Sequence, residues 1–228
     1  RACAFLADRS VVIADGHHRY QTALRYRDEQ RAAGAGPDAP SEATLAFFAN
    51  ADAEGSLLLP IHRAVVAVAA PSAADWCERL PDWQCREVRI GAGRDIDDVL
   101  AAELAPHAGH PAFAADDGSG TLRVFSQARA LGEDLVVDVL EREVLRAVFG
   151  LGEAEIAGGA VEFFKHADRA AAAVRAGACS VALYLNPVDH EDVFRVAQGG
   201  GVMPQKSTFF FPKVPTGVVF RTHDAAPA

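Results

Sequence analysis

The pattern of apolar and polar positions predicts short strands and helices that do not alternate regularly. Apolar runs bounded by turn residues predict strands, whereas apolar residues at helical spacing, as over 133–149, predict helices. The two kinds of element mix without strict strand–helix–strand alternation, and no repeat period is visible. The pattern therefore predicts an α+β fold with mixed sheets and helices, and not a doubly wound sheet.

The first third of the chain is predicted to hold several strands and one helix. The predicted ranges are one or two strands within 1–14, a helix over 17–33 with Asp15 as its N-cap, a loop over 34–40, strands over 44–50 and 56–68, and a turn over 51–55.

The remainder of the chain carries clearer helix starts and stops. We predict helices over 72–80, 96–105, 133–149, 167–176 and 189–197, strands over 84–90, 179–185, 207–211 and 217–221, and a hairpin of 111–115 with 122–126. Ser72 and Asp189 are the expected N-caps, and Gly150 and Gly177 are the expected helix ends. We expect two regions, 1–70 and 71–228, with the loop 202–213 returning to the first.

The stretch Asp15-Gly16-His17-His18-Arg19-Tyr20 is the strongest candidate for a functional site. A glycine turn at the start of a helix presents backbone N–H groups to an anion, and Gly16 lets a ligand come close to the backbone. Arg19 can bind two phosphate oxygens, and His17 or His18 can donate a hydrogen bond or move a proton. The alternative is an ordinary capped helix with exposed histidines.

A metal site is a second interpretation of the same turn. Adjacent residues on a helix project about 100° apart, so His17 and His18 are poor joint ligands. One of them could join Asp15 or His62, but magnesium carried in with a nucleotide is the favoured metal.

Two further segments carry candidate ligand-binding residues. His62 and Arg63 interrupt an apolar strand after Pro60, and the alternative is an edge strand with outward polar residues. Lys206 and Ser207 follow three glycines and offer a charge and a hydroxyl.

The common catalytic and nucleotide-binding motifs are absent from the sequence. It contains no G-x-x-x-x-G-K-[ST] phosphate-binding loop, no G-x-G-x-x-G dinucleotide motif, no G-x-S-x-G nucleophile elbow and no H-E-x-x-H zinc motif. Possible general bases are Glu141, Glu143, Glu162 and Asp168, and their spacing singles out none.

The composition and charge of the chain limit the classes of molecule that it is expected to bind. Half of the 228 residues are hydrophobic, and the net charge is −9. An acidic chain argues against binding to a nucleic-acid backbone, whereas locally basic stretches near the turn and over 202–223 suit a small anionic ligand. Four scattered cysteines, no signal peptide and no membrane-spanning run favour the cytoplasm. Because the chain begins with Arg1 and its only methionine is Met203, we expect a fragment of a longer protein.

Four stretches carry a resemblance that extends in order over nearly the whole chain. They are I-A-D-G-H-H-R-Y at 13–20, L-P-I-H-R at 59–63, L-N-P at 185–187 and M-P-Q-K-S-T-F-F at 203–210. They resemble the uncharacterised domain-of-unknown-function family ten-fifteen, in which proline is usual where this chain has Gln205 and threonine where it has Ile61. Neither difference removes a charge.

The turn itself looks like that of the ParB/sulfiredoxin superfamily, which includes a free serine kinase and CTP-binding partition proteins. The resemblance implies that region 1–70 is the C-terminal part of a nucleotide-binding domain. It implies that Gly16, His17, His18 and Arg19 contact the phosphates of a nucleoside di- or triphosphate, with Asp15 beside them.

Three functions follow as hypotheses. The first is a small-molecule phosphotransferase that uses a nucleotide and Mg²⁺, with Asp15, His18 and Arg19 as catalytic residues and with His62, Arg63, Lys206 and Ser207 as further binding residues. The second is a nucleotide-responsive binding module without turnover, as a possible homo-oligomer. The third is a metal-dependent hydrolase.

Overall fold

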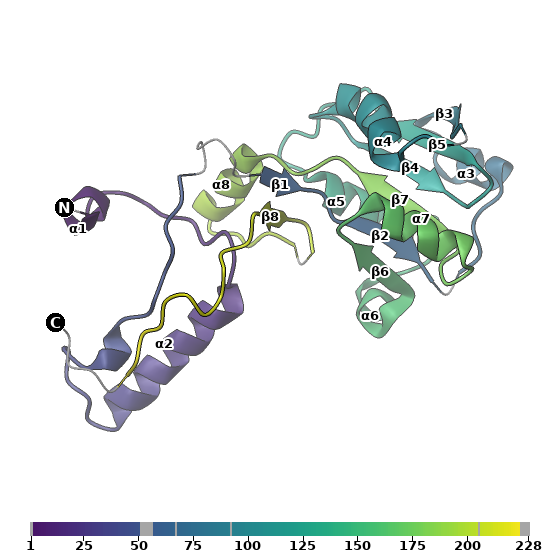
Figure 1. Cartoon of the computed structure of the whole chain (residues 1–228). Coiled ribbons are helices and arrows are strands. Elements are labelled where there is room, and N and C mark those ends of the chain that lie inside the picture. The colour runs from purple at the N-terminus through teal and green to yellow at the C-terminus, as the bar shows by residue number, and fades with distance from the viewer. Residues whose placement is uncertain (1, 51–56, 67, 92, 205, 224–228) are drawn as a thin grey trace. The chain divides into compact units, whose positions relative to one another are not determined.

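The structure is a computed structural model that describes residues 2–50, 57–66, 68–91, 93–204 and 206–223. Its helices and antiparallel sheets confirm the α+β class predicted from the sequence. The chain divides into two compact units, one of residues 1–57 with 210–228 and one of residues 58–209 (Figure 1). Residue 70, where the sequence suggests a boundary, lies within the second unit.

The helices and strands are short. The helical segments are α1 (Ala2–Leu6), α2 (His17–Ala32), η1 (Pro40–Glu42), α3 (Ala73–Arg79), α4 (Ile96–Leu104), η2 (Ala105–His107), α5 (Val136–Val139), η3 (Leu140–Arg146), α6 (Glu153–Glu155), η4 (Ile156–Ala160), α7 (Ala167–Arg175) and α8 (His190–Gln198). The strands are β1 (Leu57–Leu59), β2 (His62–Val65), β3 (Gln84–Arg89), β4 (Ala112–Asp116), β5 (Thr121–Ser126), β6 (Val161–Phe164), β7 (Val181–Leu185) and β8 (Phe209–Phe211). Segments η3 and η4 are π-helical.

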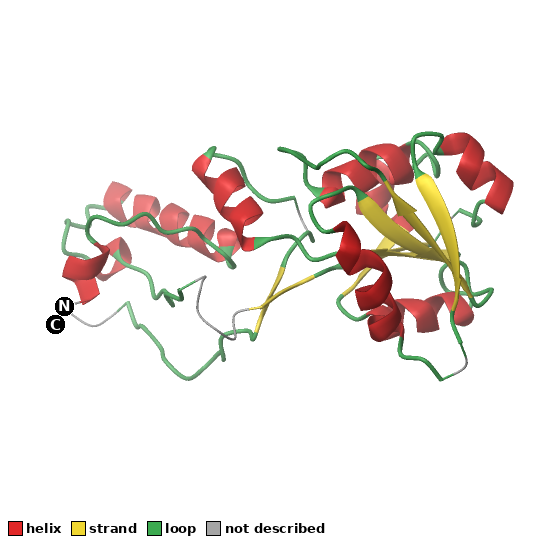
Figure 2. Cartoon of the chain, turned by 90° about the horizontal axis from the view of Figure 1, so that it is seen from above, coloured by secondary structure: helices red, strands yellow, loops and turns green. Residues whose placement is uncertain are grey.

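Residues 58–209 are organised around a six-stranded sheet. Its strand order is β3-β5-β4-β7-β2-β6, and the described pairs are antiparallel. Figure 2 shows the strands of this sheet crossing the unit with helices packed around them. Strands β1 and β8 pair in a separate two-stranded sheet.

The central strands β4, β7 and β2 are buried on both faces of the six-stranded sheet, whereas the edge strand β3 is largely exposed. Side chains alternate between the two faces along each strand. On one face, α4 and α7 pack through residues such as Val99 and Ala170 against Ala114 and Tyr184 of the sheet. On the other face, Trp76 of α3 packs against sheet residues Phe113 and Phe125 and against Phe149. The two layers of helices give this unit its hydrophobic core.

The structure of this unit confirms the predicted N-caps, hairpin and helix ends. Ser72 caps α3 in a reciprocal capping box with Asp75, and the Asp189 carboxylate caps α8. The predicted hairpin forms as β4 and β5. Gly150 and Gly177 adopt the left-handed φ values of 70° and 73° expected of glycines at helix ends.

Three strand predictions were wrong, and all fall in the first unit. Residues 2–6 form α1 and the described residues 7–15 form no strand, while 44–50 and 217–221 are also outside strands. Their apolar side chains are exposed, for example Phe47 at 71% and Phe220 at 80%. An apolar extended segment becomes a strand only when another strand pairs with it, and the described residues of this unit offer these segments no such partner.

The remaining differences are local. The single strand predicted over 56–68 is two strands, because the chain breaks at Pro60 and Ile61 between β1 and β2. The helix predicted over 133–149 begins at Val136 and continues as the π-helical η3. The turn predicted over 51–55 lies outside the described residues. Within the described ranges no helix is both long and apolar enough to cross a bilayer.

Candidate functional site

The Asp15 turn opens helix α2 in the first unit. Gly16 is the residue at the helix start, with φ 89° and ψ 26°, a left-handed conformation that glycine adopts without a steric penalty. The expected N-cap role of Asp15 was wrong, because Gly16 holds that position and no side chain caps the helix. The backbone turn therefore leaves the first amides of α2 without the usual side-chain acceptor.

Three backbone N–H groups at this helix start bond to no acceptor among the described residues. The amide of Tyr20 is the first to bond back, to the carbonyl oxygen of Gly16 at 2.9 Å. Within the described part of the chain, no acceptor is found for the amides of His17, His18 and Arg19. Free N–H groups at the positive end of a helix dipole are the kind of donors to which small anions bind in proteins.

The Arg19 side chain folds back over the turn. A β-carbon added at Gly16 would stand 2.9 Å from Arg19 Nη2 and 3.0 Å from its Nε, so the guanidinium lies against the glycine backbone. The side chain is 79% exposed, and its Nη2 lies 3.8 Å from Asp15 Oδ2. The glycine makes room for the guanidinium, which brings its five N–H donors to the same helix start as the open amides.

Asp15 is held by a residue from the far end of the chain. Lys213 Nζ donates a hydrogen bond to Asp15 Oδ2 at 3.0 Å, and Figure 1 shows the C-terminal segment running beside α2. Partial burial raises the pKa of Asp15, but Lys213, the Gly16 amide and Arg19 outweigh it and hold that pKa below its usual value. The carboxylate is therefore ionised at neutral pH. Lys213 was not among the residues singled out from the sequence.

The two histidines of the turn differ in exposure. His17 is half-buried and His18 is exposed, and the His18 carbonyl accepts a hydrogen bond from Thr22 Oγ1 at 2.8 Å. Neither imidazole has a partner among the described residues, so both can donate to a ligand at the helix start. The described residues hold no group of three His, Cys, Asp or Glu side chains placed to bind a metal, so the hydrolase hypothesis gains no support here.

His62 lies in the second unit and is nearly fully buried, at 3% exposure. Its Nδ1 accepts a hydrogen bond from the Leu185 amide at 3.3 Å, and its ring meets the Tyr184 ring edge-on at 5.3 Å between centroids. Burial, with the nearby charges of Arg63 and His166, lowers the pKa of His62 to about 4. The imidazole is therefore neutral at physiological pH and is a poor proton shuttle there.

Arg63 lies on the opposite face of the same sheet and is 5% exposed. Its Nη1 donates to the Ile61 carbonyl at 2.5 Å, and its Nη2 donates to the Lys206 carbonyl at 3.3 Å. Burial lowers the pKa of Arg63 to about 10, against the opposing influence of Glu141 and Asp138. Arg63 thus ties the loop before β8 to the sheet, and its binding of a ligand stays a prediction.

Lys206 and Ser207 belong to that loop. Lys206 is the only non-glycine residue with a positive φ among the described residues, at 60°, and it is exposed. Ser207 is buried, and its hydroxyl donates to the Pro204 carbonyl. The structure thus brings His62, Arg63, Lys206 and Ser207 into one unit, and Asp15 to Arg19 into the other.

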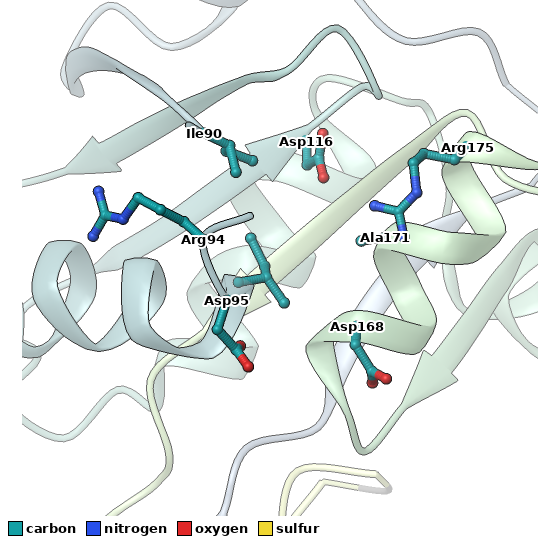
Figure 3. A pocket seen from close by; sticks show the side chains of 8 residues that line it. Ile90, Arg94, Asp95, Asp116, Asp168, Ala171 and Arg175 are labelled. Carbon is teal, nitrogen blue, oxygen red and sulfur yellow. The ribbon is translucent and has the colours of Figure 1, made fainter. Parts of the chain in front are cut away.

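The possible general bases have different surroundings. Glu143 accepts hydrogen bonds from Trp83 Nε1 and Gln127 Nε2, each at 3.0 Å, and has a structural role in this network. Asp168, in contrast, lines a cavity with charged residues that the sequence did not single out, among them Asp116 and Arg175 (Figure 3). Spacing could not reveal that cavity, because its residues come from separate segments of the chain.

The sequence of more than half of the chain matches a known protein family. Residues 1–133 match the family described as "Protein of unknown function (DUF1015)", so the chain belongs to that uncharacterised family. No curated protein matches the chain.

Solved structures similar to the chain come from two kinds of protein. One is a conserved hypothetical protein from Pyrococcus furiosus, with 18% identity and a TM-score of 0.45, over 89% of this chain and 71% of that one. Another is a free serine kinase in complex with AMP, with 16% identity and a TM-score of 0.42, over 86% of this chain. A mutant of that kinase in complex with ADP has 14% identity and a TM-score of 0.43. This chain spans 66% of the kinase chains.

Proposed function

We propose that the turn from Asp15 to Arg19 binds the phosphates of a nucleoside di- or triphosphate, and that the protein transfers a phosphoryl group to a small molecule. The observation that carries the proposal is the set of open amides of His17, His18 and Arg19 beside a guanidinium that packs on Gly16. Phosphate oxygens accept several hydrogen bonds at once and carry the charge that both the helix start and the guanidinium favour.

The ion pairs of the turn are compatible with an exchange of partners. Arg19 Nη2 is 3.8 Å from Asp15 Oδ2, beyond hydrogen-bond distance, and both side chains are more than half exposed. An entering phosphate group would compete with the Asp15 carboxylate for Arg19 and for Lys213. Since solvent-exposed ion pairs are weak, this exchange costs little.

The residues of the turn would have different roles in phosphoryl transfer. The amides and Arg19 would neutralise the charge on the transferred group, and His17 or His18 would add a donor. Mg²⁺ is usually held by one or two carboxylates together with substrate phosphates, and Asp15 fits that role because it is ionised beside the proposed phosphate site. The proposal does not require His62, Arg63, Lys206 or Ser207, which belong to the other unit.

A nucleotide-responsive binding module without turnover is the second candidate, and one observation favours it. Asp15 is the carboxylate of the turn, and its pKa is held below the usual value while Lys213 donates to it. An efficient general base has a pKa near the working pH, so Asp15 is a poor base for activating an acceptor hydroxyl.

Isothermal titration of the protein with ADP and ATP, with and without Mg²⁺, tests the binding step. R19A should lower the affinity about ten- to hundredfold, because a charge-assisted interaction is lost. Its melting temperature without ligand should stay unchanged, since Arg19 is 79% exposed. The matched control is R25A, which removes the same charge from an exposed site on the same helix.

The proposal is rejected if neither nucleotide binds, or if R25A weakens binding as much as R19A does. Phosphorus-31 NMR of ATP with a panel of small alcohols and amines then separates the two candidate functions. A new phosphoester or phosphoamide resonance that R19A does not produce supports the phosphotransferase. Binding with no consumption of ATP supports the module without turnover.

A further inference from the structure

A cavity of about 250 Å³ opens on the α4 and α7 face of the six-stranded sheet. Figure 3 shows α4 on one side, α7 on the other and the sheet behind. The lining residues are Ile90, Arg94, Asp95, Ile96, Asp116, Asp168, Ala171 and Arg175. The volume lies below the roughly 300–1,000 Å³ typical of sites for drug-sized ligands, so the cavity suits a metabolite of a few heavy atoms.

Asp116 is the most buried of the charged residues that line the cavity, at 4% exposure. Its Oδ1 accepts from the Gly118 amide at 2.9 Å, and its Oδ2 accepts from the Tyr184 hydroxyl at 3.3 Å. Burial and the Asp116 charge both raise the pKa of Tyr184, so that hydroxyl stays protonated. Each oxygen of Asp116 thus accepts one hydrogen bond from the protein, and a carboxylate can accept about four.

The positive side of the cavity is Arg175, near the end of α7. In Figure 3 its guanidinium extends back over Ala171, whereas Arg94 extends away from the cavity. The positive charge of Arg175 opposes the rise in the pKa of Tyr184, whereas the negative charge of Asp116 adds to it. The charges of Arg175 and Asp116 therefore both influence the Tyr184 hydroxyl. Arg175 is exposed, and no carboxylate oxygen of the described residues lies within ion-pair distance of it.

The other two carboxylates of the cavity are engaged elsewhere. Asp95 Oδ1 accepts from the Asp97 amide at 2.8 Å as the N-cap of α4, and Asp168 lies 4.0 Å from Arg169. Among the described residues, no ion pair joins the arginines of the cavity to its aspartates. The fold thus holds opposite charges around one small space without letting them neutralise each other.

We propose that this cavity binds a small zwitterion, a molecule that carries a cationic and an anionic group a few bonds apart. The cationic group would be held by Asp116, with Asp95 and Asp168 adding to the negative field. The anionic group would be held by Arg175. A ligand with only one charge would pair with either Asp116 or Arg175 and would leave the other without a partner. An unpaired charge costs free energy in a partly enclosed site. The inference is independent of the nucleotide proposal, because all these residues belong to the unit of residues 58–209.

Ligand-observed NMR with the whole chain tests the inference. The probes are glycine and taurine, which carry both charges, and methylamine and acetate, which carry one each. Saturation transfer should appear for at least one zwitterion, and its affinity should exceed that of either single-charge probe about tenfold or more. The measurement is repeated with excess ADP, which should leave the affinity for the zwitterion unchanged whether or not ADP binds at the Asp15 turn.

The variant R175Q keeps a polar side chain but removes the charge, and it should lower the affinity for the zwitterion about ten- to hundredfold. R146Q is the control, because Arg146 is exposed on η3, outside the cavity. D168N gives a second variant at an exposed position and should weaken binding of the zwitterion and of methylamine alike. The inference is overturned if no zwitterion binds at millimolar concentration, if acetate binds as tightly, or if R175Q and R146Q behave alike.

Discussion

Replacing His62 with glutamine should remove much of the pH dependence of folding in the unit of residues 58–209. The imidazole is buried, and its pKa falls from the usual 6.5 to about 4. Between these values the unfolded chain binds a proton that the folded chain does not. Stability therefore rises with pH across this window, and it is lost as the pH falls from 6.5 toward 4.

The magnitude follows from the two pKa values. Each pH unit within the window changes the free energy of unfolding by about 1.4 kcal/mol, so the whole window accounts for about 3 kcal/mol. That is a large part of the stability of an ordinary domain, which is about 5–15 kcal/mol. Above pH 6.5 the imidazole is neutral in both states, and its contribution no longer varies.

Urea unfolding followed by tryptophan fluorescence measures this loss directly. Both tryptophans of the chain, Trp76 and Trp83, lie within residues 58–209, so the signal reports that unit. H62Q retains an acceptor for the Leu185 amide but cannot titrate, and its stability should fall about 3 kcal/mol less than that of the parent protein between pH 7 and pH 4.

H107Q is the matched control, since His107 is only half-buried near the end of η2. The effect of H62Q on the pH curve should exceed that of H107Q. If H62Q runs parallel to the parent protein, then burial of His62 does not set the acid sensitivity, and the reasoning from its pKa is wrong.

Three further substitutions give independent tests. G16A should lower ADP affinity about tenfold or more in calorimetry, because its methyl group would meet Arg19 Nη2 at 2.9 Å and because φ 89° is strained by about 1–2 kcal/mol for alanine. S72A should cost about 1 kcal/mol in urea unfolding, since the capping box of α3 is lost. W76A should cost about 3–5 kcal/mol by circular dichroism, because Trp76 is 1% exposed among three phenylalanine rings.

Sequence reasoning succeeded where the structural code is local. Ser72 caps a helix through its hydroxyl and the amide three residues later, and Gly177 ends one through its own left-handed backbone. The hairpin of β4 and β5 needs only two apolar runs and a glycine-containing turn between them. Such signals depend on neighbours within a few residues, so they can be read without knowledge of the rest of the fold.

Strands predicted in the first unit failed for the opposite reason. Segment 44–50 has the apolar character of a strand, yet Leu45, Phe47 and Phe48 are all more than half exposed. A high β-propensity indicates that a segment would fit into a sheet, but a strand forms only where a neighbouring strand is present to pair with it. Helix α2 forms beside these segments with no buried residue. Its side chains make exposed contacts, such as the ion pair of Arg31 with Glu42 at 2.5 Å.

A related limit explains the π-helical segment η3. The apolar positions Val136, Leu140, Val144 and Val148 have helical spacing, and three of them are fully buried as expected while Val136 is nearly so. That spacing fixes which side faces the core. It carries no information on whether each amide bonds four or five residues back, because both patterns keep a similar face inward.

The two ligand sites proposed for this protein differ in how far the sequence could reveal them. The anion receptor uses consecutive residues, because a left-handed glycine, open amides and an arginine three residues on are all features of one helix start. A six-residue stretch therefore predicts it. The zwitterion cavity draws Asp116 from a strand, Arg175 from α7 and Asp95 from the start of α4. The sequence around each of these residues shows no sign of a binding site. Only the packing of α4 and α7 on the sheet brings the three residues together. A site encoded in this way can be recognised only after the tertiary fold is known. The R175Q titration tests whether this packing creates a binding site for a zwitterion.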